Sequence, residues 1–328
     1  MTETQPITSL HQFLNQLVSD VRVYDLGRRL HKVSATDFEA FEAGKIPYPH
    51  PYLHQAWLGL VLCSAEQQQA EATAIWFLRF PLDEQGKLRL PDRDKFLQQL
   101  LMSVGANLQA ARDGKRLQAV LDGNPFVFTP PPERQAAFNA RIKLALTLPP
   151  SEFFAPALAY LQQAAQRGDP QKEWQNLGLQ GLADVAVRWR KKDIHRALLA
   201  TLPQLPAAVF ASISECLEHE TIDAQLAAAL IQRLETAGAA ADTKVAAAAI
   251  RGISHSVAIG LRREALRRVL ASDLASSADV LVALATRCGE DLLDSHLNLA
   301  FLEALAAQGQ DTFNRVMADL MFQPGLRA

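Results

Sequence analysis

The sequence lacks most of the features that mark specialised classes of protein. Its 328 residues include three cysteines, and Cys63, Cys216 and Cys288 lie far apart within apolar segments. This distribution favours reduced thiols in a core over disulfide bonds. No apolar run approaches the roughly 20 residues of a membrane-spanning helix, and the N-terminus has no basic segment followed by an apolar run. We therefore expect a cytoplasmic protein with no membrane segment.

Neither sign of charge dominates the chain. The 33 basic and 35 acidic residues give a formal net charge of −2. A balance of this kind provides no global attraction to nucleic acid or to an anionic membrane. Hydrophobic residues make up 49% of the chain and charged residues 21%, as in ordinary globular proteins. A globular chain of 328 residues is long enough for roughly two domains with separate cores.

The motifs that identify many enzymes are also missing. We find no Gly-rich phosphate loop, no G-x-S-x-G and no C-x-x-C. His50 and His54 have the spacing of two zinc ligands on a helix, but prolines flank His50 and no third ligand is identifiable. Glu218, His219 and Glu220 are predicted to end a helix, where a histidine can satisfy the last carbonyls. We predict no catalytic residue, no metal site and no cofactor.

Residues 1–123 have the pattern of an α+β domain. A helix is expected over residues 9–19 with Ser9 as N-cap, and another over residues 34–44 with Ser34 or Thr36 as N-cap. Alternating apolar residues predict a hairpin over residues 21–34, and the segments QAWLGLVLCS and TAIWFLRF predict two buried antiparallel strands. A third helix follows over residues 92–108. The order predicts an antiparallel sheet with flanking helices, although the strand order cannot be read from it.

Three phrases in this first half carry a family resemblance. They are YDLGRRLHKVS from Tyr24, IPYPHPYLHQAW from Ile46, and WFLRFPLDEQGKL from Trp76. Together they resemble the pattern of an uncharacterised bacterial domain-of-unknown-function family of single-chain proteins of similar length. The resemblance covers most of the chain and implies a bacterial, cytoplasmic setting. Because that family has no assigned activity, the resemblance implies no catalytic or ligand-binding residue.

A Pro-rich linker is predicted over residues 124–132, and helices are expected from residue 133 to residue 328. An apolar phrase recurs there as LQGLA from Leu179, FASIS from Phe210, IRGIS from Ile250 and LVALA from Leu281. The mean spacing is about 34 residues, which is typical of helical repeats. The sequence therefore predicts a HEAT-like α-solenoid in which Leu182, Ile213, Ile253 and Leu284 are equivalent buried positions.

Two basic clusters in the second half are the candidate binding residues. They are Arg188, Arg190, Lys191 and Lys192, and then Arg262, Arg263, Arg267 and Arg268. The spacing of the second cluster places its four arginines on one broad helical face, which a solvated solenoid surface also explains. We predict a non-enzymatic protein-interaction module or adaptor that binds a protein partner. A nucleic-acid-associated protein is the first alternative, and an enzyme with an active site between the domains is the second. The oligomeric state is not predicted.

Overall fold

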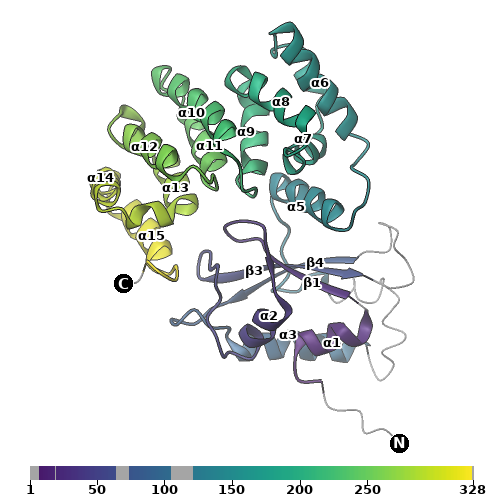
Figure 1. The fold of residues 1–328 in the computed structure, drawn as a ribbon. Helices are drawn as coiled ribbons and strands as arrows, with labels where there is room; N and C mark the ends of the chain where they lie inside the picture. Colours follow the sequence, from purple (N-terminus) through teal and green to yellow (C-terminus); the bar gives the residue numbers. More distant parts are fainter. Residues whose placement is uncertain (1–6, 19, 64–73, 105–120, 327–328) are drawn as a thin grey trace, which may run out of the picture. The chain divides into compact units, whose positions relative to one another are not determined.

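The structure is a computed structural model of the chain, and it describes residues 7–18, 20–63, 74–104 and 121–326 (Figure 1). The chain divides into two compact units. The first unit consists of Met1–Pro130 together with Phe322–Arg327, and the second consists of Pro131–Met321. Among the described residues, every helix is too short or too polar to cross a membrane.

The first unit contains a four-stranded antiparallel sheet. Its strands are β1 (Asp20–Asp25), β2 (His31–Val33), β3 (Gln55–Cys63) and β4 (Ala74–Pro81). They lie in the order β2-β1-β3-β4, with Val23 opposite both Val33 and Leu60. The predicted hairpin and the predicted pair of buried strands are both present, so the expected antiparallel sheet is confirmed.

Three helices cover one face of this sheet: α1 (Leu10–Leu17), α2 (Ala35–Glu42) and α3 (Leu90–Val104) (Figure 1). Ser9 and Ser34 cap α1 and α2 as predicted, because their side chains accept hydrogen bonds from backbone amides of the first turn. Phe13, Phe38 and Phe96 bring the three helices into one core with the inward-facing residues of the strands. Burial of these large side chains, at about 1.5–3 kcal/mol each, is the main stabilisation of the unit.

The segment predicted as a linker begins as part of the first unit. The backbone amide of Arg79 on β4 donates to the carbonyl of Phe126 (2.7 Å), and that of Phe128 donates to the carbonyl of Phe77 (3.1 Å). Phe126 is buried and lies 5.3 Å from the ring of Phe80. Residues 126–128 thus cover an edge strand that would otherwise leave backbone groups unpaired. Phe322, near the C-terminus, joins the same core and stacks on His54.

The second unit is helical throughout its regular structure. Its helices are α5 (Pro132–Ala145), α6 (Phe154–Arg167), α7 (Leu179–Val187), α8 (Lys192–Thr201), α9 (Ala207–Leu217), α10 (Ala224–Ala239), α11 (Thr243–Ile253), α12 (Ile259–Leu270), α13 (Ala278–Arg287), α14 (Ser295–Ala306) and α15 (Gln310–Met321). The odd-numbered helices α5 to α13 pack in succession, and so do the even-numbered helices α6 to α14. Alternate helices therefore form two layers (Figure 1).

Helix starts in this unit follow capping chemistry. Asp223, Asp242 and Asp294 each accept a hydrogen bond from a backbone amide of the first turn of α10, α11 and α14.

The four recurring apolar phrases all contribute buried residues to the core, but they occupy different positions along their helices. Leu182, Ile213, Ile253 and Leu284 are all buried, with at most 4% of each residue exposed. However, LQGLA begins α7 whereas IRGIS ends α11, so the phrases lie at different distances from the starts of their helices. The glycine at position 181, in the first phrase, is explained by a close backbone contact. A Cβ at this position would lie 2.2 Å from the carbonyl oxygen of Phe153, so a larger residue does not fit.

Candidate functional site

Helix α12 and the loop before it expose a run of apolar side chains. Val257, Ile259 and Leu261 are 63%, 50% and 41% exposed, and nothing lies within 4 Å of the position where Gly260 would carry a Cβ. The apolar sequence VAIGL is typical of a buried segment. In α12, however, the apolar residues that lie in the core come later in the helix, for example Leu266. Residues 257–261 are called the apolar ledge below. A ledge of this composition is a candidate contact surface for another macromolecule.

Two of the four arginines on α12 share one buried aspartate. Arg262 donates from Nε and Nη2 to the Asp291 carboxylate at 2.7 and 2.9 Å, and from Nη1 to the carbonyl of Ser256 at 2.7 Å. Burial opposes the charge of Arg262, but the Asp291 carboxylate outweighs it, and the pKa of Arg262 is raised. Arg263 reaches the same carboxylate at 3.1 Å. Asp291 lies in the short helix η6 (Gly289–Leu293), so these contacts join α12 to the next part of the array.

The other two arginines of α12 are exposed and also paired. Arg268 lies 2.8 Å from the carboxylate of Glu235 on α10 and 3.3 Å from that of Glu264. Arg267 has longer contacts, 3.3 Å to Glu264 and 3.4 Å to Asp294. The prediction of one broad face of four arginines therefore needs correction at Arg262, which is 7% exposed because it neutralises Asp291.

The first basic cluster also contains both buried and exposed side chains. Arg188 is 5% exposed and lies 2.7 Å from the Asp184 carboxylate, so it is not available on the surface as predicted. Arg190 is exposed, stacks on the ring of Trp189 at 4.5 Å and donates to the carbonyl of Thr221. Lys191 and Lys192 are exposed. Lys192 begins α8, and α10 packs between α8 and α12, so the two clusters lie on different helices that are not neighbours in the array.

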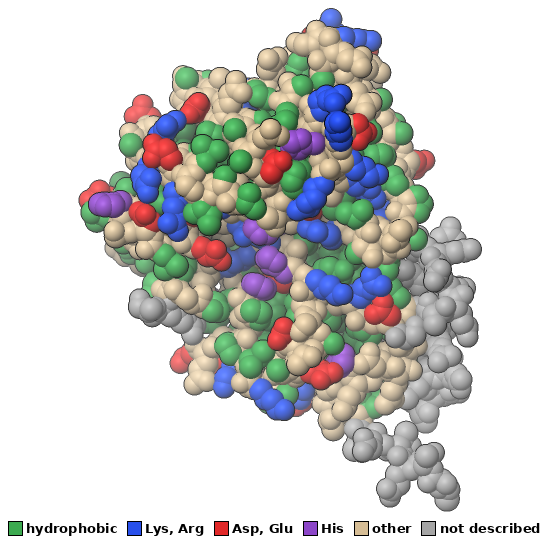
Figure 2. Space-filling view, viewed as in Figure 1, with side chains coloured by type: hydrophobic (Ala, Val, Ile, Leu, Met, Phe, Trp, Pro, Cys, Tyr) green, Lys and Arg blue, Asp and Glu red, His purple; other side chains and the backbone are tan. Residues whose placement is uncertain are grey.

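A groove of about 250 Å³ lies between α10 and α12. Its wall is mainly apolar, and it includes Ile231, Leu234, Gly238, Ala265, Val269 and Leu274. Arg268 and Glu235 also line it, so their ion pair connects the two sides of the groove. Figure 2 shows hydrophobic, basic and acidic side chains interspersed over α12 and α14, without a field of one sign.

Sequence reasoning missed a buried ion-pair network around Glu218. The Glu218 carboxylate accepts from Arg251 Nε (2.6 Å) and from Arg287 Nε (2.9 Å), which belong to α11 and α13. Burial disfavours its ionisation, yet the charges of Arg287 and Arg251 hold the pKa of Glu218 far below its usual range. Burial lowers the pKa of His219 itself. The expectation that this triplet merely ends a helix is therefore incomplete, because Glu218 ties three helices together.

Glu220 is a second buried carboxylate of this segment, with a different environment. It lies 2.6 Å from Arg141 Nη2 on α5 and 3.7 Å from Arg190 Nη1. Burial nevertheless raises the pKa of Glu220 to about 7, more than the two arginines lower it. A carboxyl with this pKa can exchange a proton near neutral pH, and such groups occur in active sites as well as in structural networks.

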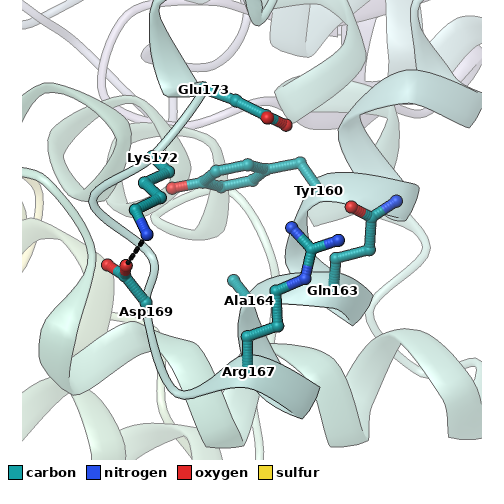
Figure 3. A pocket seen from close by; sticks show the side chains of 7 residues that line it. All are labelled: Tyr160, Gln163, Ala164, Arg167, Asp169, Lys172 and Glu173. Carbon is teal, nitrogen blue, oxygen red and sulfur yellow. Dashed lines mark ion pairs between the residues drawn. The ribbon is translucent and has the colours of Figure 1, made fainter.

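A polar pocket lies beside the end of α6 (Figure 3). Its volume is about 190 Å³, and its charged side chains are Arg167, Asp169, Lys172 and Glu173, around the ring of Tyr160. Lys172 pairs with Asp169 at 3.2 Å, and the hydroxyl of Tyr160 donates to the carbonyl of Pro170. Burial and the Asp169 charge raise the pKa of Tyr160. Since cations and anions are equal in number here, the pocket selects no particular charge of ligand.

In the first unit, two of the phrases that carry the family resemblance meet. Tyr48 donates from its hydroxyl to the buried carboxylate of Asp25 at 2.6 Å, and burial raises the pKa of Tyr48 well above its ordinary value. His50 stacks on His31 at 4.6 Å, whereas His54 stacks on Phe322 at 3.9 Å. The two histidines thus face different partners. Within the described part of the chain, no group of three or more His, Cys, Asp or Glu side chains could hold a metal ion.

The chain thus consists of an α+β unit and a layered helical unit, and helix α12 of the helical unit carries an apolar ledge, paired arginines and one side of an apolar groove. The chain belongs to the family described as Protein of unknown function (DUF3549), whose model matches residues 5–328. This match confirms membership of an uncharacterised family over nearly the whole chain. No curated protein and no solved structure matches the chain.

Proposed function

We propose that this protein is a non-enzymatic protein-interaction module and that it binds a protein partner through the α12 face of its helical unit. The observation that carries the proposal is the apolar ledge, where Val257, Ile259 and Leu261 remain exposed together. Soluble proteins rarely leave large apolar side chains adjacent on the surface unless a partner covers them. Arginines beside an apolar centre are also typical of protein interfaces.

The pairing of the arginines supports a protein partner over nucleic acid. Affinity for nucleic acid comes largely from arginines and lysines that replace counterions on phosphates. On α12, Arg262 and Arg263 share Asp291, while Arg267 and Arg268 lie near Glu264. Phosphate binding would have to break these contacts, and the whole chain has a net charge of −2. A mixed, charge-balanced surface better suits a protein that offers both apolar and polar groups.

The proposal includes a HEAT-like solenoid geometry for the second unit. Its support is the two layers of alternate helices and the mean sequence spacing of about 34 residues between the apolar phrases. Such arrays present extended surfaces that bind other proteins. We also place the protein in the bacterial cytoplasm, where the buried thiols of Cys216 and Cys288 would stay reduced.

The ledge offers a test that leaves the fold intact. Gly260→Glu places a charge at the centre of the ledge in open space, and an acid in the first turn of a helix is favourable. Ala200→Glu on the exposed side of α8 adds the same charge elsewhere and is the matched control. We expect affinity capture from the native host, read by quantitative mass spectrometry, to lose a protein with Gly260→Glu only. Capture of the same proteins in the same amounts by both variants would contradict the proposal.

A further inference from the structure

The pocket beside the end of α6 contains one cation and one anion that have no partner in the described part of the chain. Of its four charged side chains, Lys172 and Asp169 pair with each other at 3.2 Å, and Figure 3 marks this ion pair. The side chains of Arg167 and Glu173 make no ion pair or hydrogen bond with any residue that the structure describes. We propose that this pocket binds a small zwitterion, a molecule with an ammonium group and a carboxylate, such as a free amino acid.

The two unpaired charges come from different walls of the pocket. Tyr160, Gln163 and Arg167 are three and four residues apart on α6, so they share one face of the helix. Glu173 belongs to the loop that follows α6. Figure 3 shows its carboxylate and the guanidinium of Arg167 on opposite sides of the Tyr160 ring. Because the two charges face one pocket without contacting each other, a ligand between them can pair with both.

Each charged group of a zwitterion finds a suitable partner here. A carboxylate can accept two parallel hydrogen bonds from the guanidinium of Arg167, and the side-chain amide of Gln163 can donate another. An ammonium group is attracted by the carboxylate of Glu173 and by the face of the Tyr160 ring. A ligand with a single charge would match Arg167 or Glu173 but not both, so the lining favours a zwitterion over a simple anion or cation.

The size of the pocket limits the ligand to a small metabolite. Its volume of about 190 Å³ is below the roughly 300–1,000 Å³ of pockets for drug-sized ligands. A nucleotide or a helix of another protein would not fit into this space, whereas a single amino acid would. The pocket is formed by α6 and the loop after it, so the inference does not depend on the proposed α12 face.

The loop that carries Glu173 is held in place without the two unpaired charges. The hydroxyl of Tyr160 donates to the carbonyl of Pro170, and Nε2 of Gln171 donates to the carbonyl of Gln204 at 2.9 Å. Glu173 itself has a φ of 64°, in the left-handed region that non-glycine residues seldom adopt. Residues in such conformations are concentrated at functional sites. Ligand binding by its carboxylate would explain why a glutamate, and not a glycine, occupies this position.

A series of ω-amino acids tests the inference with the full-length protein. Glycine, β-alanine and γ-aminobutyrate separate the ammonium group and the carboxylate by increasing distances, so the series also measures the span between Arg167 and Glu173. Butylamine and butyrate are controls that each lack one charge of γ-aminobutyrate. Isothermal titration calorimetry should show a dissociation constant of about 1 mM or lower for at least one zwitterion, and at least about tenfold weaker binding of both controls.

Three variants locate the binding. Arg167→Gln and Glu173→Gln each remove one charge and should weaken the best zwitterion at least about tenfold. Lys244→Gln and Glu303→Gln remove exposed charges of α11 and α14 and should leave its affinity unchanged. Glu173→Gly should also lose binding, yet its midpoint of thermal unfolding should be at least as high as that of the wild type, because glycine adopts a positive φ without strain. This variant separates loss of the site from loss of the fold.

Several results would overturn the inference. Butylamine that binds as tightly as the best zwitterion would show a cation site, and butyrate that does so would show an anion site. Absence of binding by all three zwitterions would show that the pocket does not select this class of ligand. Unchanged affinity in Arg167→Gln or Glu173→Gln would place any observed binding elsewhere on the protein.

Discussion

Glu220→Gln should change how the stability of the protein depends on pH. In the wild type, burial raises the pKa of Glu220 to about 7, although Arg141 lies 2.6 Å away. An ordinary glutamate in the unfolded chain has a pKa near 4.5. Between these two values the folded protein keeps a proton that the unfolded chain has lost. The free energy of unfolding therefore falls as the pH rises through this window.

The magnitude follows from the size of the pKa difference. Each pH unit in the window costs about 1.4 kcal/mol, so Glu220 removes about 3 kcal/mol of stability between about pH 4.5 and 7. His219 acts in the opposite direction, because burial keeps it neutral in the folded state while the unfolded histidine gains a proton below about pH 6.5. In the wild type these two effects oppose each other below about pH 6.5.

Glutamine cannot titrate, so Glu220→Gln leaves the His219 effect unopposed. Below about pH 6.5 the stability of the variant should rise with pH more steeply than that of the wild type, by up to about 1.4 kcal/mol per unit, because the opposing effect of Glu220 is absent. Urea denaturation across this range, followed by far-UV circular dichroism, reports the second unit because it is mainly helical. Glu303→Gln, which changes an exposed glutamate of α14, is the control for lost charge. Identical pH profiles for wild type and Glu220→Gln would refute the reasoning.

Three further changes test the packing of the second unit. Asp291→Asn leaves the buried Arg262 without its carboxylate and should cost about 3–5 kcal/mol in urea denaturation, and a cost below about 1 kcal/mol would show that the pair is not buried as described. Gly181→Ala brings a Cβ to 2.2 Å from a backbone oxygen and should lower the midpoint of thermal unfolding far more than Gly178→Ala, whose Cβ meets the side chain of Phe153 at 3.1 Å. Near-equal effects would rule out the close approach. Alanine at each of the four repeat positions should cost about 2–4 kcal/mol in chemical denaturation, and near-neutral effects at two or more would undo the repeat assignment. The four positions are Leu182, Ile213, Ile253 and Leu284.

Local pattern was sufficient for much of the fold. Alternation of apolar residues predicted the hairpin of the first unit, and two continuous apolar segments predicted its second strand pair. Candidate capping serines indicated the starts of α1 and α2, because each of these signals acts within a few residues. The order of the strands depends on pairing between distant segments, which alternation does not encode. For the same reason, residues 126–128 read as part of a linker, although they pair with the edge of β4 in the structure.

The candidate site was only partly visible in the sequence. The arginines of α12 stood out as a cluster, but the burial of Arg262 depends on Asp291, which lies 29 residues further along the chain. The groove was not visible at all, because Leu234 and Val269 read simply as core residues of separate helices. The apolar ledge was masked in the same way, since Val257 and Ile259 have the composition of a buried segment.

The spacing of the ion pairs provides a signal that a search of the sequence could use. Arg251 pairs with Glu218, and Arg268 pairs with Glu235, each across 33 residues, close to the mean spacing of about 34 between the apolar phrases. In a stacked helical array each repeat contacts its neighbours, so opposite charges one repeat apart are brought face to face. These ion pairs hold neighbouring helices together, and each of the charges is already paired with an opposite charge of the same chain. The proposed binding of a partner therefore rests on surface features without such an internal counterpart, and on α12 these are the ledge at residues 257–261 and the apolar wall of the groove.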